Sequence, residues 1–282
     1  MTSLTRSIAG FVAGFSRQDI PAASLTLARE AFVDLVGVML AGSNEPVVHI
    51  LTTTTAGDMA GPTCSVLMNA RVRRSAKAAS LVNGTAAHAL DFDDVQFNAH
   101  PSTVLVPAIL AEAERGGASG LQACKAYVLG YEVWGELHGR EKNPYHDKGW
   151  HPTAVMGPVA ATAAVAFLRG LDLEATRTAL SLAASFTGGV VANFGSMTKP
   201  MHAGRAAAAA IDAVNLAQAG FTAGEDGIGA QDGLLAALST HGQVNRDAAT
   251  GLGRRWFSVT TPLVFKKYPV CFSSHRPIDA IL

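Results

Sequence analysis

Three carboxylates stand close together in residues 91–94, which read Asp-Phe-Asp-Asp and follow a helix-forming stretch. Carboxylates at the C-terminal end of a helix face the negative end of its dipole, which costs about 0.3 to 1 kcal/mol each unless a partner compensates. If the helix continues, His88 and Asp91 share one face and could form an acid–base pair, and His100 adds an imidazole nearby. A solvated acidic turn beside a packed histidine is the alternative.

A further histidine, His151, stands directly before the longest apolar stretch of the chain, in a segment that reads Gly-Trp-His-Pro-Thr. At a helix N-terminus the imidazole meets the positive end of the dipole, which disfavours the imidazolium form and keeps the ring neutral near pH 7. A neutral imidazole accepts a proton, so His151 is a candidate general base. A capping loop with a stacked Trp150 is the other interpretation.

Cationic side chains precede an alanine-rich stretch in residues 198–205. Lys199, His202 and Arg205 fall before or within the first turn of the expected helix, whose positive end favours anions. This pattern indicates a site for a carboxylate or a phosphate, with a basic surface turn as the alternative. The glycines nearby lack the GK[ST] ending of a P-loop, which argues against a nucleotide site.

The last segment with chemical potential lies in residues 266–275 and combines Lys266, Lys267, a tyrosine and His275. These cations and this imidazole follow an apolar stretch and could line a site. A nucleophilic pair of Cys271 and His275 is disfavoured, because neither residue has the helix N-terminal setting expected of a low-pKa thiol.

Helices must position most of these residues, because alanine, the strongest helix former, dominates the middle of the chain. Alanine and glycine on facing surfaces also let helices approach closely. The expected helices cover residues 21–42, 75–90, 107–114, 121–138, 153–168, 173–184 and 203–219.

The composition changes near residue 250, where residues 256–261 and 263–265 are aromatic and β-branched and predict strands. The sequence therefore predicts a mainly α fold. We expect a large all-helical domain over residues 1–250, followed over residues 251–282 by the beginning of a smaller α+β domain.

The charge balance limits the possible partners, since 22 basic and 22 acidic residues give no net charge. No overall field attracts nucleic acid or anionic lipid, and the apolar run over residues 154–168 is shorter than the roughly 20 residues that span a bilayer. Three cysteines far apart form neither a disulfide framework nor a metal knuckle, so we expect a cytoplasmic protein. The low charged fraction of 16% indicates that part of the surface is buried between subunits.

Taken in order, these segments resemble the MmgE/PrpD family over nearly the whole chain. The resemblance is carried by motifs that are weak alone and specific in series: Asn83-Gly84 with His88 and residues 91–94, His100-Pro101-Ser102, residues 149–153, Lys199 with residues 202–206, and residues 266–269 with His275.

The resemblance implies a cofactor-independent lyase, a dehydratase or decarboxylase, that acts without metal on a small polycarboxylate such as 2-methylcitrate or cis-aconitate. It also implies a homodimer. In the decarboxylase branch, the positions that line the active site match Asp91, His100, His151, Lys199 and the lysine of the Lys-Tyr-Pro stretch within residues 266–269. The substrate-binding residues that we expect are Lys266, Lys267, Arg205, His202, His88 and His275.

The reactions of this family share a carbanion-like species next to a carboxylate, so the site must move a proton and hold negative charge. Lys199, Arg205 and Lys266 would bind the carboxylates and stabilise the developing charge. For the proton, His151 is the first candidate base and His100 the second. Asp91 would orient His88 or His100, or donate a proton itself.

Three alternatives remain open. The first is an epimerase of the same family, and the second is a Mg²⁺-dependent lyase that uses Asp91, Asp93 and Asp94. The third is an inactive helical scaffold, in which the polar segments would point separately into solvent. Members of the family usually continue well beyond the position that matches Leu282, so we expect a truncated chain whose activity is weak and whose strands promote association.

Overall fold

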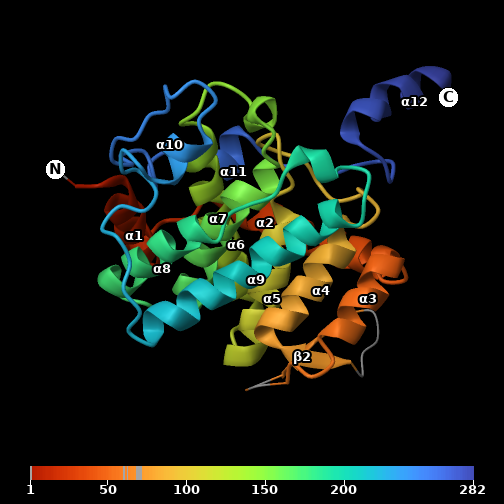
Figure 1. Cartoon of the computed structure of the whole chain (residues 1–282), viewed down its shortest axis with the longest axis horizontal. Coiled ribbons are helices and arrows are strands. Elements are labelled where there is room, and N and C mark those ends of the chain that lie inside the picture. Colours follow the sequence, from red (N-terminus) through yellow and green to blue (C-terminus); the bar gives the residue numbers. More distant parts are fainter. Residues whose placement is uncertain (1, 60, 62, 68–71) are drawn as a thin grey trace.

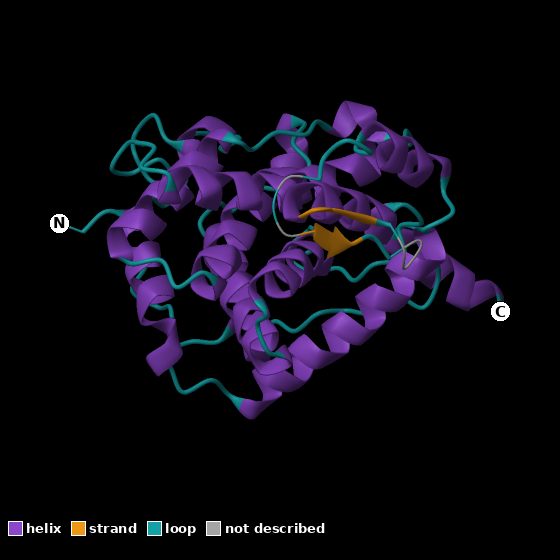
Figure 2. Cartoon of the chain, turned by 90° about the horizontal axis from the view of Figure 1, so that it is seen from below, coloured by secondary structure: helices purple, strands orange, loops and turns teal. Residues whose placement is uncertain are grey.

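The computed structural model describes residues 2–59, 61, 63–67 and 72–282 of the chain. Helices make up most of these residues, and the only sheet among them is a two-stranded antiparallel hairpin (Figures 1 and 2). The mainly α fold expected from the sequence is therefore confirmed.

Nine helices form the body of the described chain. They are α1 (Leu4–Gly14), α2 (Ala22–Gly42), α3 (Pro46–Thr54), α4 (Ala76–His88), α5 (Ser102–Gly116), α6 (Gly120–His138), α7 (Pro152–Leu168), α8 (Leu173–Ser185) and α9 (Thr198–Gln218). The shorter elements are β1 (Thr63–Ser65), β2 (Arg73–Ser75), α10 (Leu234–Leu238), α11 (Phe257–Thr260), α12 (His275–Ile281) and the 3-10 turns Phe15–Arg17, Tyr145–Lys148, Val191–Asn193 and Phe272–Ser274.

All seven helices predicted from the sequence are present, as α2 and α4 to α9. Side-chain caps explain several of their starts: Ser75 caps α4, Asp172 caps α8, and Ser119 forms a capping box with Gln122 at α6. Two helices begin earlier than expected, α5 at Ser102 and α9 at Thr198. The earlier start of α9 matters for the site, because it places Lys199 and His202 within the helix.

The helix α7 lies at the centre of the body and packs against α5, α6, α8 and α9 (Figure 1). Almost all of its 17 residues are buried, so its surface is apolar on every side rather than on one stripe. Among the described residues, no helix is both long and apolar enough to cross a membrane.

The helices α4 and α9 make the most extensive helix–helix contact, and two glycines meet where they cross. A Cβ atom added to Gly84 would lie 2.8 Å from the Cα atom of Gly204, and one added to Gly204 would lie 2.1 Å from the carbonyl oxygen of Leu81. Because α4 carries His88 and α9 carries Lys199, this crossing sets the distance between two parts of the candidate site.

The strands predicted over residues 256–261 and 263–265 are wrong. Residues 257–260 form the helical turn α11, and Val264 makes only an isolated antiparallel bridge with Val95. The reason is Glu132 of α6, whose buried carboxylate accepts hydrogen bonds from the backbone N–H groups of Phe257 and Ser258 at 2.7 and 2.9 Å. These contacts cap a helical turn and override the β propensity of the local sequence.

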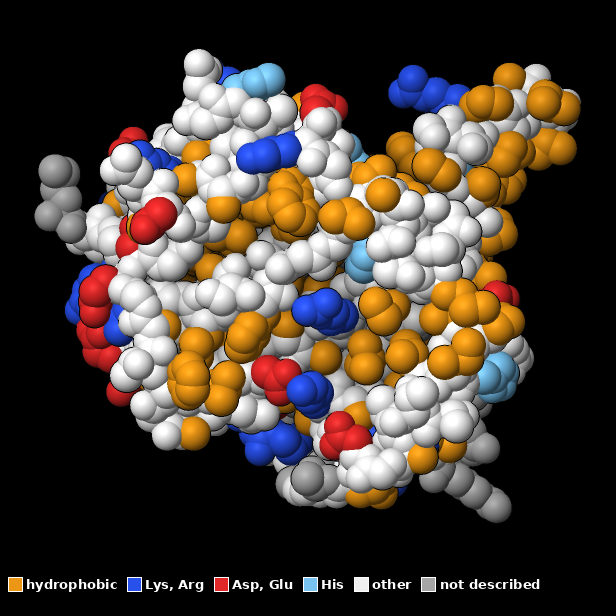
Figure 3. All heavy atoms as spheres, in the orientation of Figure 1, with side chains coloured by type: hydrophobic (Ala, Val, Ile, Leu, Met, Phe, Trp, Pro, Cys, Tyr) orange, Lys and Arg blue, Asp and Glu red, His pale blue; other side chains and the backbone are white. Residues whose placement is uncertain are grey.

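The C-terminal segment, residues 261–282, first passes beside the acidic turn of residues 91–94 and then leaves the helical body (Figure 1). Two backbone hydrogen bonds of 3.0 and 3.1 Å join Val264 to Val95 and bring Lys266 beside that turn. Beyond it, α12 extends away from the other helices, and apolar side chains are exposed in it and in the 3-10 turn before it, including Ile281 and Phe272 (Figures 1 and 3). The division of the chain at residue 250 stays a prediction.

The glycine crossing gives a first test. Gly204→Ala should destabilise the chain by roughly 1–3 kcal/mol, because the added methyl group has no room between α4 and α9. Gly10→Ala in α1 is the matched control: the atom nearest to its added methyl group lies 3.9 Å away, which is an ordinary contact, and alanine should stabilise that helix by about 0.5–1 kcal/mol. Denaturant unfolding measures both, and opposite signs are expected.

Candidate active site

The acidic turn does not continue α4, which ends at His88. The backbone of Asp91 is left-handed with a φ of 48°, and Phe97 and Asn98 in the same loop also have positive φ values. Residues other than glycine rarely adopt this conformation, and such strain is held in place by surrounding contacts. The pairing of His88 with Asp91 on one helix face therefore does not form.

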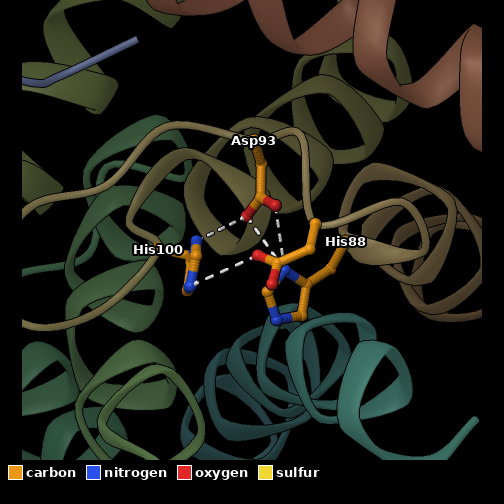
Figure 4. Close-up of side chains that lie close together, drawn as sticks. His88, Asp93 and His100 are labelled. Atoms are coloured by element: carbon orange, nitrogen blue, oxygen red, sulfur yellow. Dashed lines mark hydrogen bonds and ion pairs between the residues drawn. The ribbon is translucent and has the colours of Figure 1, made fainter. Parts of the chain in front are cut away.

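Asp93 instead lies between two imidazoles (Figure 4). Each of its carboxylate oxygens is 3.0 Å from Nδ1 of His88, and Oδ2 is 3.1 Å from Nδ1 of His100. An ionised carboxylate only accepts hydrogen bonds, so both Nδ1 atoms carry hydrogen. Asp93, rather than Asp91, orients both histidines.

The charges of His88 and Asp93 are set by their burial and by their contact with each other. Burial raises the pKa of Asp93, but the two imidazoles beside it outweigh burial and hold its pKa well below the usual range. Burial lowers the pKa of His88 to about 4 in spite of the neighbouring carboxylate. At neutral pH the pair is an ionised Asp93 that accepts a hydrogen bond from a neutral His88.

His100 has its two ring nitrogens in different surroundings. Nδ1 also lies 3.0 Å from the backbone carbonyl oxygen of Asp94, so it faces two acceptors and must carry hydrogen. In the neutral ring Nε2 is then the proton acceptor, and it lies 3.9 Å from Oδ1 of Asp91. A ring oriented through one nitrogen and open at the other has the geometry of a general base.

Asp91 holds two lysines from distant parts of the chain. Nζ of Lys199 is 2.9 Å from its Oδ2, and Nζ of Lys266 is 2.6 Å from its Oδ1 and 2.5 Å from its backbone carbonyl oxygen. Burial opposes ionisation of Asp91, but the hydrogen bond and charge of Lys266, then the charges of Lys199 and His100, lower its pKa to about 2. The side chain of Lys266 is fully buried, whereas that of Lys199 is 17% exposed.

His151 is the residue before the first turn of α7, as expected, and its ring is buried. Burial lowers its pKa, and the nearby rings of His88, His100 and His202 and the charge of Lys199 lower it further. The ring is thus neutral, as the sequence predicted, although burial rather than the helix dipole is the main cause. Its Nδ1 lies 3.2 Å from Nδ1 of His202.

Three predicted substrate-binding residues lie outside this cluster. Arg205 is exposed further along α9, and Lys267 is exposed and pairs with Asp279 at 3.0 Å. His275 packs against the rings of Tyr268 and Phe272. The cluster that does assemble within the described chain consists of His88, Asp91, Asp93, His100, His151, Lys199, His202 and Lys266.

A metal ion has donor atoms here, since His88, Asp91, Asp93 and His100 each offer one within 4.8 Å of the others. These donors already have partners: Asp91 binds two ammonium groups, and both imidazoles bind Asp93. Two carboxylates and two lysines balance in charge, so a divalent cation would add unpaired charge to a buried site. Asp94 turns away toward the backbone N–H of Ser102, which leaves the three-aspartate Mg²⁺ site without its third ligand.

Comparison with known proteins identifies the family. The family model of the MmgE/PrpD N-terminal domain matches residues 6–247 of this chain. The chain belongs to the MmgE/PrpD family.

Relatives in this family share about a quarter of the residues of this chain. It is 28% identical to the cis-aconitate decarboxylases of Mus musculus and Homo sapiens over 286 residues, which cover 99% of this chain and 58% and 59% of those proteins. It is 27% identical over 299 residues to the cis-aconitate decarboxylase-like protein oryM of Aspergillus oryzae, covering 61% of that protein. The chain thus spans about three fifths of the length of these relatives.

In this MmgE/PrpD chain, Asp93 and Asp94 have different contacts, which the sequence alone did not predict. Asp93 orients the imidazoles, and Asp94 is fully buried, with Oδ1 3.4 Å from the backbone nitrogen of Ser102 and no partner for Oδ2 among the described residues. Their adjacency in the sequence suggested a single acidic cluster. The positive φ of Asp91 turns the chain after α4 and so separates Asp93 and Asp94 from Asp91. The available signal in the sequence was aspartate itself, which tolerates left-handed backbone.

The buried carboxyl of Asp94 predicts a pH dependence of stability. Burial, with the charges of Asp93 and Asp34, raises its pKa to about 8. Between about pH 4, where an unfolded aspartate loses its proton, and pH 8, the folded chain binds one proton more, so this group makes stability fall as pH rises. Asp94→Asn removes this loss.

The melting temperature of Asp94→Asn relative to the natural chain should therefore rise from pH 5 to pH 8 by about 3 °C or more, the shift of roughly 1 kcal/mol in a chain of this size. Above pH 8 the difference should level off. The exposed Asp232→Asn is the control. A difference between the Asp94 variant and the natural chain that is independent of pH would contradict a buried, protonated carboxyl.

Proposed function

We propose that this chain carries the substrate-binding and proton-transfer residues of a cofactor-independent lyase that acts on a small polycarboxylate, with cis-aconitate as the first candidate. One observation carries the proposal: two lysines meet at Asp91 beside a histidine that is oriented by a buried carboxylate. Helical scaffolds without activity have no need to bring these groups together. The names of the relatives support cis-aconitate.

Lys199 is the cation best suited to meet a carboxylate of the substrate. It uses one hydrogen bond on Asp91, its ammonium group has three donors, and its side chain is partly exposed. Phe194 covers one side of the ammonium group, with the ring centroid 5.3 Å from Nζ. Lys266 is buried behind Asp91 and adds positive potential without reaching solvent.

Other hollows of the described surface suit a polycarboxylate less well. Cavities of about 680 and 450 Å³ lie beside Asp226 and beside Glu114, and no lysine or arginine lines either of them. Cavities of about 560 and 290 Å³ do contain cations, Arg29 in one and Lys77 with Arg205 in the other, but acidic side chains line both and no histidine lines either. An anion with two or three charges needs cations that replace its hydration. The cluster at Asp91 is therefore the candidate for the substrate site.

His100 is the group that we assign to proton transfer. Loss of CO₂ breaks a carbon–carbon bond and leaves an electron pair that spreads toward a remaining carboxylate, and a proton must then reach carbon. The imidazolium form of His100 can deliver that proton from Nε2, because the Asp93 carboxylate at Nδ1 stabilises it. His151 lacks an anionic partner and is neutral, which suits it to donate a hydrogen bond from Nε2 to a substrate oxygen.

Dehydration and epimerisation need the same groups, so the reaction type remains part of the proposal. In dehydration His100 would remove a proton next to the carboxylate and return it to the hydroxyl group that leaves the adjacent carbon as water. In epimerisation it would remove a proton from carbon and a proton would return to the opposite face of that carbon. Decarboxylation comes first because the relatives are named as decarboxylases.

A homodimer and a cytoplasmic location belong to the proposal as well. Large apolar side chains are exposed on α2 and α3, among them Val33, Leu40 and Ile50, and the charged fraction is low. Such surface favours association between copies. Light scattering that gives the mass of one chain at micromolar concentration would contradict the dimer.

The lysines test the function. With cis-aconitate, the chain should release CO₂ and form an unsaturated dicarboxylate, followed by proton NMR, with 2-methylcitrate as a second substrate. Lys266→Met should lower kcat/KM by about 10- to 1,000-fold, the effect of removing one electrostatic contact at an active site. Lys267→Met is the adjacent control and should leave kcat/KM unchanged, because Lys267 pairs with Asp279.

The affinity for cis-aconitate, measured by calorimetry, should be lower in Lys266→Met than in the natural chain and unchanged in Lys267→Met. Equal losses in both variants would show that position relative to Asp91 does not matter. A natural chain that neither binds nor converts either substrate would contradict the proposal.

A further inference from the structure

His202 faces His151 nitrogen to nitrogen inside the helical body. The two Nδ1 atoms are 3.2 Å apart, the ring centroids are 5.4 Å apart, and the exposed fractions of the residues are 5% and 1%. The rings come from α9 and from the start of α7. Water is thus largely excluded from this contact, and each Nδ1 has the other as its partner.

This contact requires one hydrogen atom between the two nitrogens. Two protonated Nδ1 atoms would bring N–H groups against each other, and two unprotonated ones would oppose their lone pairs. Burial lowers the pKa of both rings, and the charge of Arg205 adds to this for His202, so both are neutral. The rings must therefore be in opposite tautomers with respect to Nδ1.

The backbone around residue 189 holds both rings in place. The backbone N–H of His151 donates to the carbonyl oxygen of Gly189 at 2.9 Å. A Cβ atom at Gly189 would lie 3.1 Å from Cγ and Nδ1 of His202 and 2.5 Å from the Cβ atom of Ala154. Phe194 contacts the other side of His151 edge-on, with ring centroids 4.9 Å apart. The imidazoles have little freedom to turn away from each other.

We propose that His202 is a positioning residue that donates its Nδ1–H to Nδ1 of His151 and thereby fixes His151 as the tautomer with hydrogen on Nε2. The direction follows from the task of His151 and rests on the proposed function. A neutral imidazole beside a polycarboxylate must present N–H, because a lone pair would repel the carboxylate. With Nδ1 occupied by His202, Nε2 is the nitrogen left for the substrate.

The cluster then contains two histidines, His100 and His151, each of which is oriented by a partner of a different kind. His100 donates to the carboxylate of Asp93, which stabilises its charged form, whereas His151 accepts from the neutral ring of His202, which does not. An imidazole thus acts as a proton carrier at His100 and as a neutral hydrogen-bond donor at His151. Environments that separate two like groups in this way commonly mark different catalytic roles.

The tautomer of His151 can be measured without turnover. In the chain labelled with ¹⁵N-histidine and free of ligand, the nitrogen shifts and couplings of His151 should show hydrogen on Nε2 and none on Nδ1 between pH 6 and 8. His202→Phe removes the donor and should convert His151 to a mixture of both tautomers. His202→Asn restores an N–H donor near the same point and should restore the single tautomer.

Kinetics provide the second readout. His202→Phe should lower kcat/KM by roughly 3- to 10-fold, the worth of one hydrogen bond, and His202→Asn should recover most of it. His49→Phe, at an exposed histidine of α3, is the control for both measurements. If the Phe variant does not fold, the Asn variant and the natural chain still report the tautomer.

The outcomes separate this inference from the proposed function. Hydrogen on Nδ1 of His151 in the natural chain, or an unchanged His151 spectrum in His202→Phe, would overturn the inference even if the chain converts polycarboxylates. The expected tautomer in a chain that neither binds nor converts cis-aconitate or 2-methylcitrate would uphold the pairing and contradict the proposed function.

Discussion

The ammonium group of Lys266 is buried, and a buried charge needs an opposite charge and hydrogen bonds to remain ionised. Asp91 provides both: its carboxylate and its own carbonyl oxygen accept from Nζ at 2.6 and 2.5 Å. To offer both acceptors in one direction, the backbone of Asp91 takes a left-handed conformation. The same carboxylate also binds Lys199, so the acidic turn, α9 and the C-terminal segment meet at one side chain.

This junction has consequences for the residues around it. The turn at Asp91 sends Asp93 inward, where burial would be costly without the two imidazole donors of His88 and His100. Meanwhile the helices that carry these groups approach closely through glycine and alanine, as at Gly84 and Gly204. A core of small side chains therefore leaves room at its edge for a polar cluster in which each aspartate and lysine has a charged or imidazole partner, whereas Nε2 of His88 has no partner among the described residues.

The sequence predicted the helices well, because alanine content and helical periodicity act locally. It also indicated the segments that form the candidate site, and Asp91, His100, His151 and Lys199 do lie together. Long-range contacts explain what it missed. Glu132 converts a β-prone segment into a helical turn, and the earlier start of α9 carries Arg205 away from Lys199 around the helix. Nothing local distinguishes Asp93 from its neighbours before the loop's path is known.

The central claim is that the groups around Asp91 form a pre-organised site for a polycarboxylate. A crystal structure of the chain with propane-1,2,3-tricarboxylate, which resembles the proposed substrate but has no double bond, tests it most directly. The account predicts a ligand carboxylate within hydrogen-bond distance of Nζ of Lys199, a second ligand oxygen near Nε2 of His151, and Lys266 still bound to Asp91. Ligand bound elsewhere, or lysines pointing away from Asp91 into solvent, would contradict it.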